Sequence, residues 1–255
     1  MSIPFPDTIT ADALFVWLIH RISEVFEDHA ILKGGMELRL LDCPRSTNDL
    51  DYVFVPYNSK NEIVEGLVKI MNEIPGAKIN KTMNSKALKI VINVAHISLQ
   101  VEANVLKECK AVAMSTNSLA NKVNQLGKII RIMSLDVALS HKLSAWNERR
   151  LMRDLYDIYY IFQIVGAKPD LDTLLARLNK IESRIPRFKK VKKMSLNDFV
   201  NELSKEQGNI SAQSVKKELS PLLDEVELAG LESKLKATIN KLVEFLEGLC
   251  VGLKE

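Results

Sequence analysis

The first half of the chain combines helical and strand-like hydrophobic patterns. Residues 11–28 repeat apolar side chains mostly at steps of three and four, which is typical of a helix with one buried face. Residues 88–94 and 99–105 instead alternate apolar and mostly polar side chains, the period of a strand that is buried on one face. Shorter segments predict strands at 30–32 and 50–56 and helices at 36–41 and 61–73. This half is therefore predicted to be a mixed α/β domain.

The second half is rich in Leu, Lys, Glu and Ala, and its pattern is helical. No glycine or proline occurs between Lys128 and Val165, which predicts one long helix over residues 134–165. Further helices are predicted over residues 170–182, 195–206, 211–227 and 231–253, and Pro221 is expected to kink or split the third of these. The predicted fold class is α+β, with a small mixed β-sheet domain and flanking helices over residues 1–125 and an all-α helical bundle over residues 126–255.

Composition and charge narrow the class of protein. A hydrophobic fraction of 47 % and a charged fraction of 26 % are typical of a packed core and exclude disorder as the main state. No apolar run reaches the roughly 18 residues of a membrane helix, and the first residues do not resemble a signal peptide. Three scattered cysteines indicate a reducing compartment, so a cytoplasmic location without a membrane partner is expected. The net charge of +3 permits a nucleic-acid partner but does not require one.

A glycine pair and two spaced aspartates carry the strongest chemical signal. Gly34 and Gly35 end a predicted strand at the start of a helix, where backbone N–H groups can bind a phosphate. Asp49 and Asp51 stand two positions apart at the start of the next strand, so both carboxylates project from one face. Glu102, on the polar face of a later strand, can add a third oxygen ligand, and Mg²⁺ is the cation that such a set would bind. Taken singly, each feature is also common in turns and at solvated strand ends.

A second charged group lies on the long helix predicted for the second half. At about 100° per residue, four charged side chains fall within about 80° of one another: Lys142, Arg149, Arg153 and Asp157. Long basic side chains on one stripe, held by Asp154 and Asp157, would suit a phosphate site. A solvated helix face with ion pairs is the alternative interpretation of the same spacing.

The order of these motifs resembles that of a known enzyme family. Gly-Gly followed after thirteen residues by Asp-x-Asp resembles the signature of the nucleotidyltransferase β superfamily. Within it, Leu-Lys-Gly-Gly at residues 32–35 with Arg-x-Thr-x-Asp-Leu-Asp at residues 45–51 is similar to the AbiEii/AbiGii toxin family. Residues 135–145 and 149–159 resemble the family's lysine motif and its closing Arg-Asp-x-x-Asp motif. One departure is Gly35, where many members of the superfamily have serine.

The resemblance implies a Mg²⁺-dependent nucleotidyltransferase that uses one or two metal ions. The implied metal ligands are Asp49, Asp51 and Glu102, and the implied catalytic set adds Lys142. Glu102 would also help the acceptor hydroxyl to lose its proton. The implied nucleoside triphosphate site consists of Lys33, Gly34, Gly35, Lys142, Asp154 and Asp157. Family resemblance alone implies an RNA acceptor, particularly the 3′ end of transfer RNA, and the toxin role in a toxin–antitoxin pair with an antitoxin protein as partner.

A basic strip at residues 184–193 has six cations and no acidic residue among its ten positions. Such a strip can bind a nucleic-acid backbone, although an exposed linker explains the composition equally well. The cations are Arg184, Arg187, Lys189, Lys190, Lys192 and Lys193. Two alternatives to an RNA-modifying enzyme stay open. The same site would label a small molecule or a protein, or the chain would be a non-catalytic module that binds nucleic acid or a partner protein.

Overall fold

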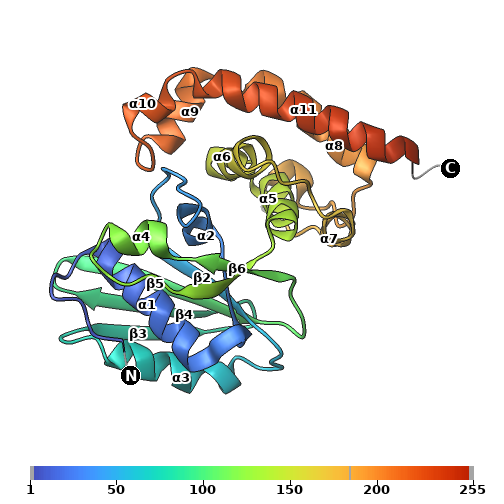
Figure 1. The fold of residues 1–255 in the computed structure, drawn as a ribbon. Coiled ribbons are helices and arrows are strands. Elements are labelled where there is room, and N and C mark those ends of the chain that lie inside the picture. The colour runs from blue at the N-terminus through green and yellow to red at the C-terminus, as the bar shows by residue number, and fades with distance from the viewer. Residues whose placement is uncertain (1–2, 184, 253–255) are drawn as a thin grey trace. The chain divides into compact units, whose positions relative to one another are not determined.

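A computed structural model describes residues 3–183 and 185–252, without the side chains of residues 250–252. The chain divides into two compact units, Met1–Ser134 and Leu135–Glu255. Within the described residues, all strands lie in the first unit, and the second unit is helical (Figure 1). The predicted α+β fold class, with a mixed sheet and flanking helices, is confirmed by this architecture. In the part of the chain that the structure describes, no helix combines the length and the hydropathy needed to cross a membrane.

A seven-stranded mixed sheet forms the frame of the first unit. Its strand order is β3-β4-β5-β2-β1-β7-β6, and the pairs β2–β5 and β1–β7 are parallel while the others are antiparallel. The strands are β1 (Ala30–Lys33), β2 (Asp49–Phe54), β3 (Lys78–Met83), β4 (Leu88–Val94), β5 (Ile97–Val105), β6 (Ala111–Ser115) and β7 (Ile129–Met133).

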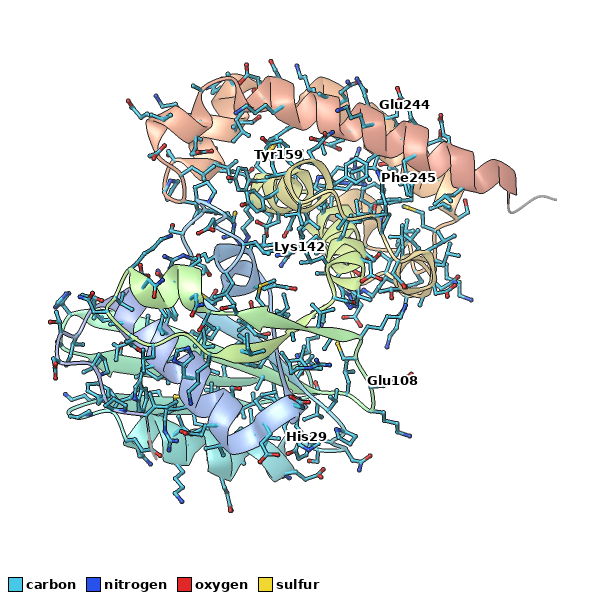
Figure 2. The ribbon with its side chains drawn as sticks, in the orientation of Figure 1. His29, Glu108, Lys142, Tyr159, Glu244 and Phe245 are labelled. Carbon is cyan, nitrogen blue, oxygen red and sulfur yellow. The ribbon has the colours of Figure 1, made fainter. Side chains whose placement is uncertain are left out.

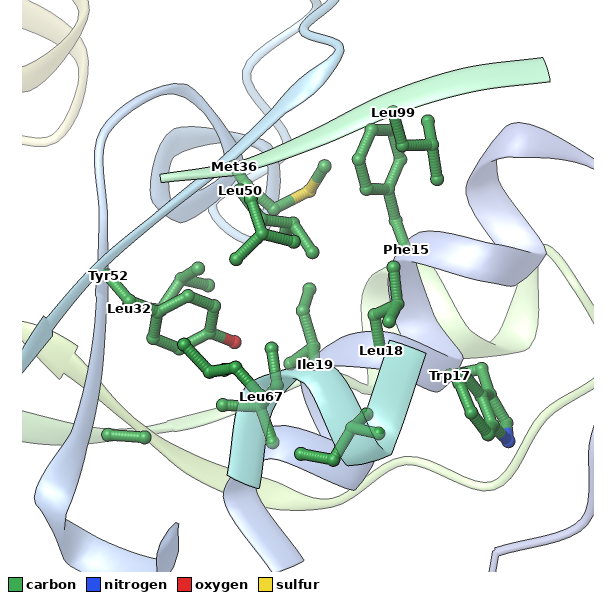
Figure 3. Packing of buried hydrophobic residues seen from close by; sticks show 14 of the residues in the cluster. Phe15, Trp17, Leu18, Ile19, Leu32, Met36, Leu50, Tyr52, Leu67 and Leu99 are labelled. Atoms are coloured by element: carbon green, nitrogen blue, oxygen red, sulfur yellow. The ribbon is translucent and has the colours of Figure 1, made fainter. Parts of the chain in front are cut away.

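Helices cover one face of this sheet and enclose the core. The helices of the first unit are α1 (Ala11–Phe26), α2 (Gly35–Arg39), α3 (Asn61–Asn72) and α4 (Asn117–Asn121). Apolar side chains of α1 and α3 pack against the apolar positions of the central strands, as Figure 3 shows for Phe15, Leu67 and Leu50. Burying each such side chain contributes about 1.5–3 kcal/mol. Because the core occupies this face, the polar positions of β2, β4 and β5 project from the other.

The hydrophobic pattern does not predict three of the strands. β3 and β6 lie at the two edges of the sheet, and most of their side chains are at least partly exposed, so they lack a buried face that would impose alternation. β7 is a short segment of apolar residues around Arg131 without alternation, and its period does not distinguish it from a helix. Because β7 pairs with β1, the first unit ends at Ser134 and not at residue 125.

The described residues of the second unit form helices of very different lengths. They are α5 (Leu135–Arg149), α6 (Met152–Tyr159), α7 (Leu171–Leu178), α8 (Leu196–Glu206), α9 (Ala212–Leu219), α10 (Glu225–Leu228) and α11 (Leu231–Gly252). A π-helical turn, Tyr160–Ile164, continues α6. The predicted helix over residues 211–227 is split into α9 and α10, and Pro221 lies in the interruption, as expected from its missing N–H group.

The single helix predicted over residues 134–165 is wrong, because the chain breaks helical geometry at Arg150. This residue has a φ of 55°, in the left-handed region that an α-helix of L-residues excludes. Its guanidinium lies over the rings of Trp146, at 4.1 Å, and Phe188, at 4.9 Å, and its Nη2 lies 3.3 Å from Oε2 of Glu202. Two of these partners are distant in sequence, so the periodicity of the segment does not reveal the break.

The buried histidine of α1 predicts a specific pH dependence. His20 is 1 % exposed, and its Nε2 lies 2.7 Å from Oγ1 of Thr116. Burial, together with the charge of Lys128, lowers the pKa of His20 from 6.5 to about 4. As the pH falls, His20 of the unfolded chain binds a proton near pH 6.5, whereas His20 of the folded chain binds it only near pH 4. We therefore expect the free energy of unfolding to fall across this interval, by up to about 3 kcal/mol from His20 alone.

Urea unfolding of the parent and of His20→Gln between pH 7 and pH 4 tests this expectation. The difference between their free energies of unfolding should shrink as the pH falls, since glutamine does not titrate. A difference that is constant across this interval would contradict the assignment.

Candidate active site

The glycine pair forms the turn between β1 and α2. Gly34 has a φ of 81°, a conformation that favours glycine. A Cβ at Gly34 would lie 2.5 Å from Oδ2 of Asp51, so the backbone passes directly against this carboxylate. The Gly34 N–H donates to Oε2 of the buried Glu37 at 3.1 Å. Of the two amides predicted to contact phosphate, that of Gly34 is therefore engaged within the protein in this structure.

A side chain at Gly35 would crowd two residues of the following motif. A Cβ at Gly35 would lie 2.8 Å from Nη2 of Arg45 and 3.0 Å from Oγ1 of Thr47. A side chain here would require the guanidinium end of Arg45 and the side chain of Thr47 to shift, and both residues belong to the Arg-x-Thr-x-Asp-Leu-Asp motif. Thr47 Oγ1 also accepts a hydrogen bond from the Asp49 N–H at 3.3 Å. Thr47 thus connects the glycine turn to Asp49, a role that motif spacing alone does not reveal.

Four charged side chains form a row across neighbouring strands, which we call the charged row: Lys33, Asp51, Glu102 and Lys89. Lys33 is the register partner of Asp51, Asp51 that of Glu102, and Glu102 that of Lys89. Register partners on adjacent strands project from the same face of a sheet, and Asp49 joins that face two positions before Asp51. The structure therefore brings the three predicted carboxylates together on one face of β2 and β5, opposite the core.

Lys89 is the member of the charged row that sequence reasoning missed. Its Nζ lies 3.0 Å from Oε2 of Glu102. The hydrogen bond and charge of Glu102, reinforced by Asp49 and Asp51, raise the pKa of Lys89. Within the described residues, no three His, Cys, Asp or Glu side chains are grouped so that they could hold one metal ion. Glu102 is paired with a lysine instead.

A second charged group lies in the second unit, between α5 and α6. Nζ of Lys142, labelled in Figure 2, lies 2.6 Å from Oδ2 of Asp157. Arg149 contacts both oxygens of Asp154, with distances of 2.6 Å from Nη2 and 3.0 Å from Nε. Lys142 and Arg149 of α5 thus pair with Asp157 and Asp154 of α6, across two helices and not along one stripe, and the third basic residue of the predicted stripe, Arg153, is exposed. Burial raises the pKa of Asp154, against the opposing charges of Arg149 and Lys142.

The basic strip has two kinds of cation. Arg187 lies 4.6 Å from the ring centroid of Phe188, and its Nη2 lies 3.2 Å from Oε2 of Glu206, so it is part of local packing. Four lysines are exposed, and within the part of the chain that the structure describes their side chains make no ion pair: Lys189, Lys190, Lys192 and Lys193. Arg184 lies outside the described residues.

Comparisons with known proteins identify the family. The family described as "Nucleotidyl transferase AbiEii toxin, Type IV TA system" matches residues 17–237. JHP933 from Helicobacter pylori shares the fold, with a TM-score of 0.56 and 17 % identity over 97 % of this chain and 98 % of that chain. An H. pylori protein provisionally named a nucleotidyltransferase has a TM-score of 0.55 and 17 % identity over 94 % of this chain and 96 % of that chain. No curated protein matches the sequence.

The family match and the fold define this protein as a nucleotidyltransferase, so the enzyme class predicted from the motifs is confirmed. More particularly, the chain belongs to the AbiEii toxin family, which the motifs at residues 32–51 and 135–159 resemble. The match continues to residue 237, well beyond the last motif that could be found by inspection.

Proposed function

We propose that the protein transfers a nucleoside monophosphate from a nucleoside triphosphate to a hydroxyl group of RNA, with Mg²⁺, as the toxin of a toxin–antitoxin pair. The observation that carries the catalytic part is the charged row, in which Asp51 and Glu102 are register partners and Asp49 shares their face. The family description, which names a toxin of a toxin–antitoxin system, supports the toxin role and the existence of an antitoxin. The RNA acceptor, in particular the 3′ end of transfer RNA, is proposed from the resemblance of the motifs alone.

The carboxylates of the first unit fit a divalent cation with the chemistry of Mg²⁺. They offer hard oxygen ligands on adjacent strands and on one face of the sheet. Asp49 and Asp51 would hold one or two ions, with Glu102 as the third ligand. A cation bound there supplies positive charge beside the substrate phosphates and increases the acidity of the acceptor hydroxyl.

The protein groups then have separable roles in the transfer. The acceptor oxygen forms a bond to the α-phosphorus, the bond to pyrophosphate breaks, and Glu102 takes the hydroxyl proton. Lys33 lies beside Asp51 in the charged row, and together with the Gly35 amide it would contact the phosphates. Lys142 would neutralise triphosphate charge. Asp157 would hold the Lys142 side chain in place, and Asp154 would hold that of Arg149.

Distribution of label among acceptors tests this function against its alternatives. The full chain is incubated with each α-labelled nucleoside triphosphate, Mg²⁺, and separate cellular fractions of RNA, protein and small molecules. We expect label on RNA, removable together with the 3′-terminal nucleotide. Label only on protein or on a small molecule would replace the RNA acceptor. Nucleotide binding without transfer to any fraction would contradict the catalytic proposal.

The four exposed lysines of the basic strip should contribute to RNA binding. Replacing Lys189, Lys190, Lys192 and Lys193 by glutamine should weaken RNA binding and lower its salt dependence, by nearly one in log–log slope for each phosphate that the strip no longer neutralises. Nucleoside triphosphate binding should not change. A matched control removes four other exposed lysines: Lys69, Lys216, Lys217 and Lys234. Equal affinity and salt slope in the two quadruple variants would exclude the strip as an RNA-binding surface.

A further inference from the structure

We propose that Lys89 is a positioning residue of the active site, which pairs with Glu102 before a divalent cation binds and releases Glu102 when the cation arrives. This inference rests on the proposed function, because it takes Asp49, Asp51 and Glu102 as the metal ligands. It adds a residue of β4 to a site that the motifs place on β1, β2 and β5.

The register of the sheet places Lys89 where it can act on the carboxylates. Lys89 and Glu102 are partners in the antiparallel pair β4–β5, and Glu102 and Asp51 are partners in the parallel pair β5–β2. The lysine ammonium lies 3.0 Å from Glu102 Oε2, the carboxylate next to Asp51 in the row. Along the row from Lys33 to Lys89 the charges are positive, negative, negative and positive.

Electrostatics explains why a lysine at this position stabilises the metal-free site. Ionised carboxylates on neighbouring strands repel each other, and a nearby cation lowers that cost. The Lys89 ammonium lies 3.0 Å from Glu102 Oε2, and the register places Asp51 next to Glu102 on the same face, so the charge of the lysine lies close to the acids. Before a metal binds, Lys89 therefore supplies part of the positive charge that the acids require.

The same interaction opposes a divalent cation. The metal would bind the carboxylate of Glu102, one oxygen of which now contacts the ammonium, and the two positive charges repel each other. The Lys89 side chain is 42 % exposed and that of Glu102 is 27 % exposed. A lysine on a flexible four-carbon stem can move into solvent from such a position without disturbing the core. The ion pair is thus weak enough to be exchanged, yet it lowers the affinity for the cation.

Calorimetric titration with Mn²⁺, in the absence of nucleotide, tests the exchange. Lys89→Met keeps the apolar stem and removes the charge, and we expect it to bind Mn²⁺ about five- to tenfold more tightly than the parent. Lys81→Met is the matched control, because Lys81 is exposed on β3 and pairs with Ile90 on the core side. It should bind Mn²⁺ as the parent does. In a Glu102→Gln background, Lys89→Met should raise the affinity by less than it does in the parent, since the ion pair is already absent and only the repulsion between the lysine and the cation is removed.

Two further measurements separate the ways in which the inference can fail. Thermal melts in the presence of a chelator or of Mn²⁺ report folding. In chelator, Lys89→Met should have a lower melting temperature than the parent, and Mn²⁺ should raise its melting temperature by more than it raises that of the parent. Lys89→Arg retains the charge and should keep an affinity close to that of the parent. Unchanged or weaker Mn²⁺ binding by Lys89→Met would overturn the role of Lys89 alone. If the parent does not bind Mn²⁺, or if Asp51→Asn binds it as tightly as the parent, the proposed metal site is wrong, and this inference is wrong with it.

Discussion

Asp51→Asn should lower the rate of nucleotidyl transfer by about a thousandfold or more while leaving the fold intact. Asp51 lies in the middle of the charged row, between Lys33 and Glu102, and Gly34 passes directly against its carboxylate. Asparagine keeps the shape of the side chain, so this close contact survives. It loses the negative charge, and with it the several kcal/mol of transition-state stabilisation that a metal ligand supplies.

Two measurements on the parent and on Asp51→Asn check this expectation: the initial rate of pyrophosphate release and the free energy of unfolding in urea. The free energy of unfolding of Asp51→Asn should equal or exceed that of the parent, because one of two neighbouring negative charges is removed. Asp172→Asn serves as the matched control, since Asp172 is exposed on α7 in the second unit. A folded Asp51→Asn variant that keeps more than about a tenth of the parental rate would exclude Asp51 as a metal ligand.

The Lys142–Asp157 pair should show the second large effect, on stability and activity together. Asp157 is 2 % exposed and Lys142 is 19 % exposed, with 2.6 Å between Nζ and Oδ2. Lys142→Met leaves the buried carboxylate without this partner, which should cost about 3 kcal/mol of folding free energy. Combining Lys142→Met with Asp157→Asn removes both charges and should recover most of that loss.

Activity should not recover with stability, which separates the two roles of Lys142. The double variant lacks the charge proposed to neutralise the triphosphate, so we expect it to bind nucleotide weakly and to react slowly. Lys205→Met is the control for losing an exposed ion pair, because Lys205 contacts Glu202 at the surface, and its stability should stay within about 0.5 kcal/mol of the parent. A double variant with both parental stability and parental kinetics would reduce Lys142 to a structural residue.

Period and spacing predicted the elements that have one buried face. Helix α1 and strands β4 and β5 follow their predicted ranges closely, since burial against a single core imposes a period of three to four or of two. The placement of Asp49, Asp51 and Glu102 on one face follows from the same geometry. Lys89 could have been added, because a tight turn at residues 95–96 fixes the register that pairs it with Glu102.

Contacts between distant residues account for what the sequence did not reveal. The break at Arg150 depends on its stacking with Phe188 and its ion pair with Glu202, which only the folded second unit brings together. The boundary between the units depends on β7 joining β1 as a parallel neighbour. The space at Gly35 is limited by Arg45 and Thr47, which follow it by ten residues or more. None of these contacts leaves a periodic signal in the sequence.

Comparing α-labelled with γ-labelled nucleoside triphosphate tests the central claim most directly. The purified full chain is incubated with total RNA and Mg²⁺, and label is followed on RNA and in pyrophosphate. Nucleotidyl transfer predicts that α-label moves to RNA, that γ-label leaves in pyrophosphate, and that both signals disappear in Asp51→Asn. Label from the γ-position on RNA, or transfer of α-label that persists in Asp51→Asn, would contradict the account.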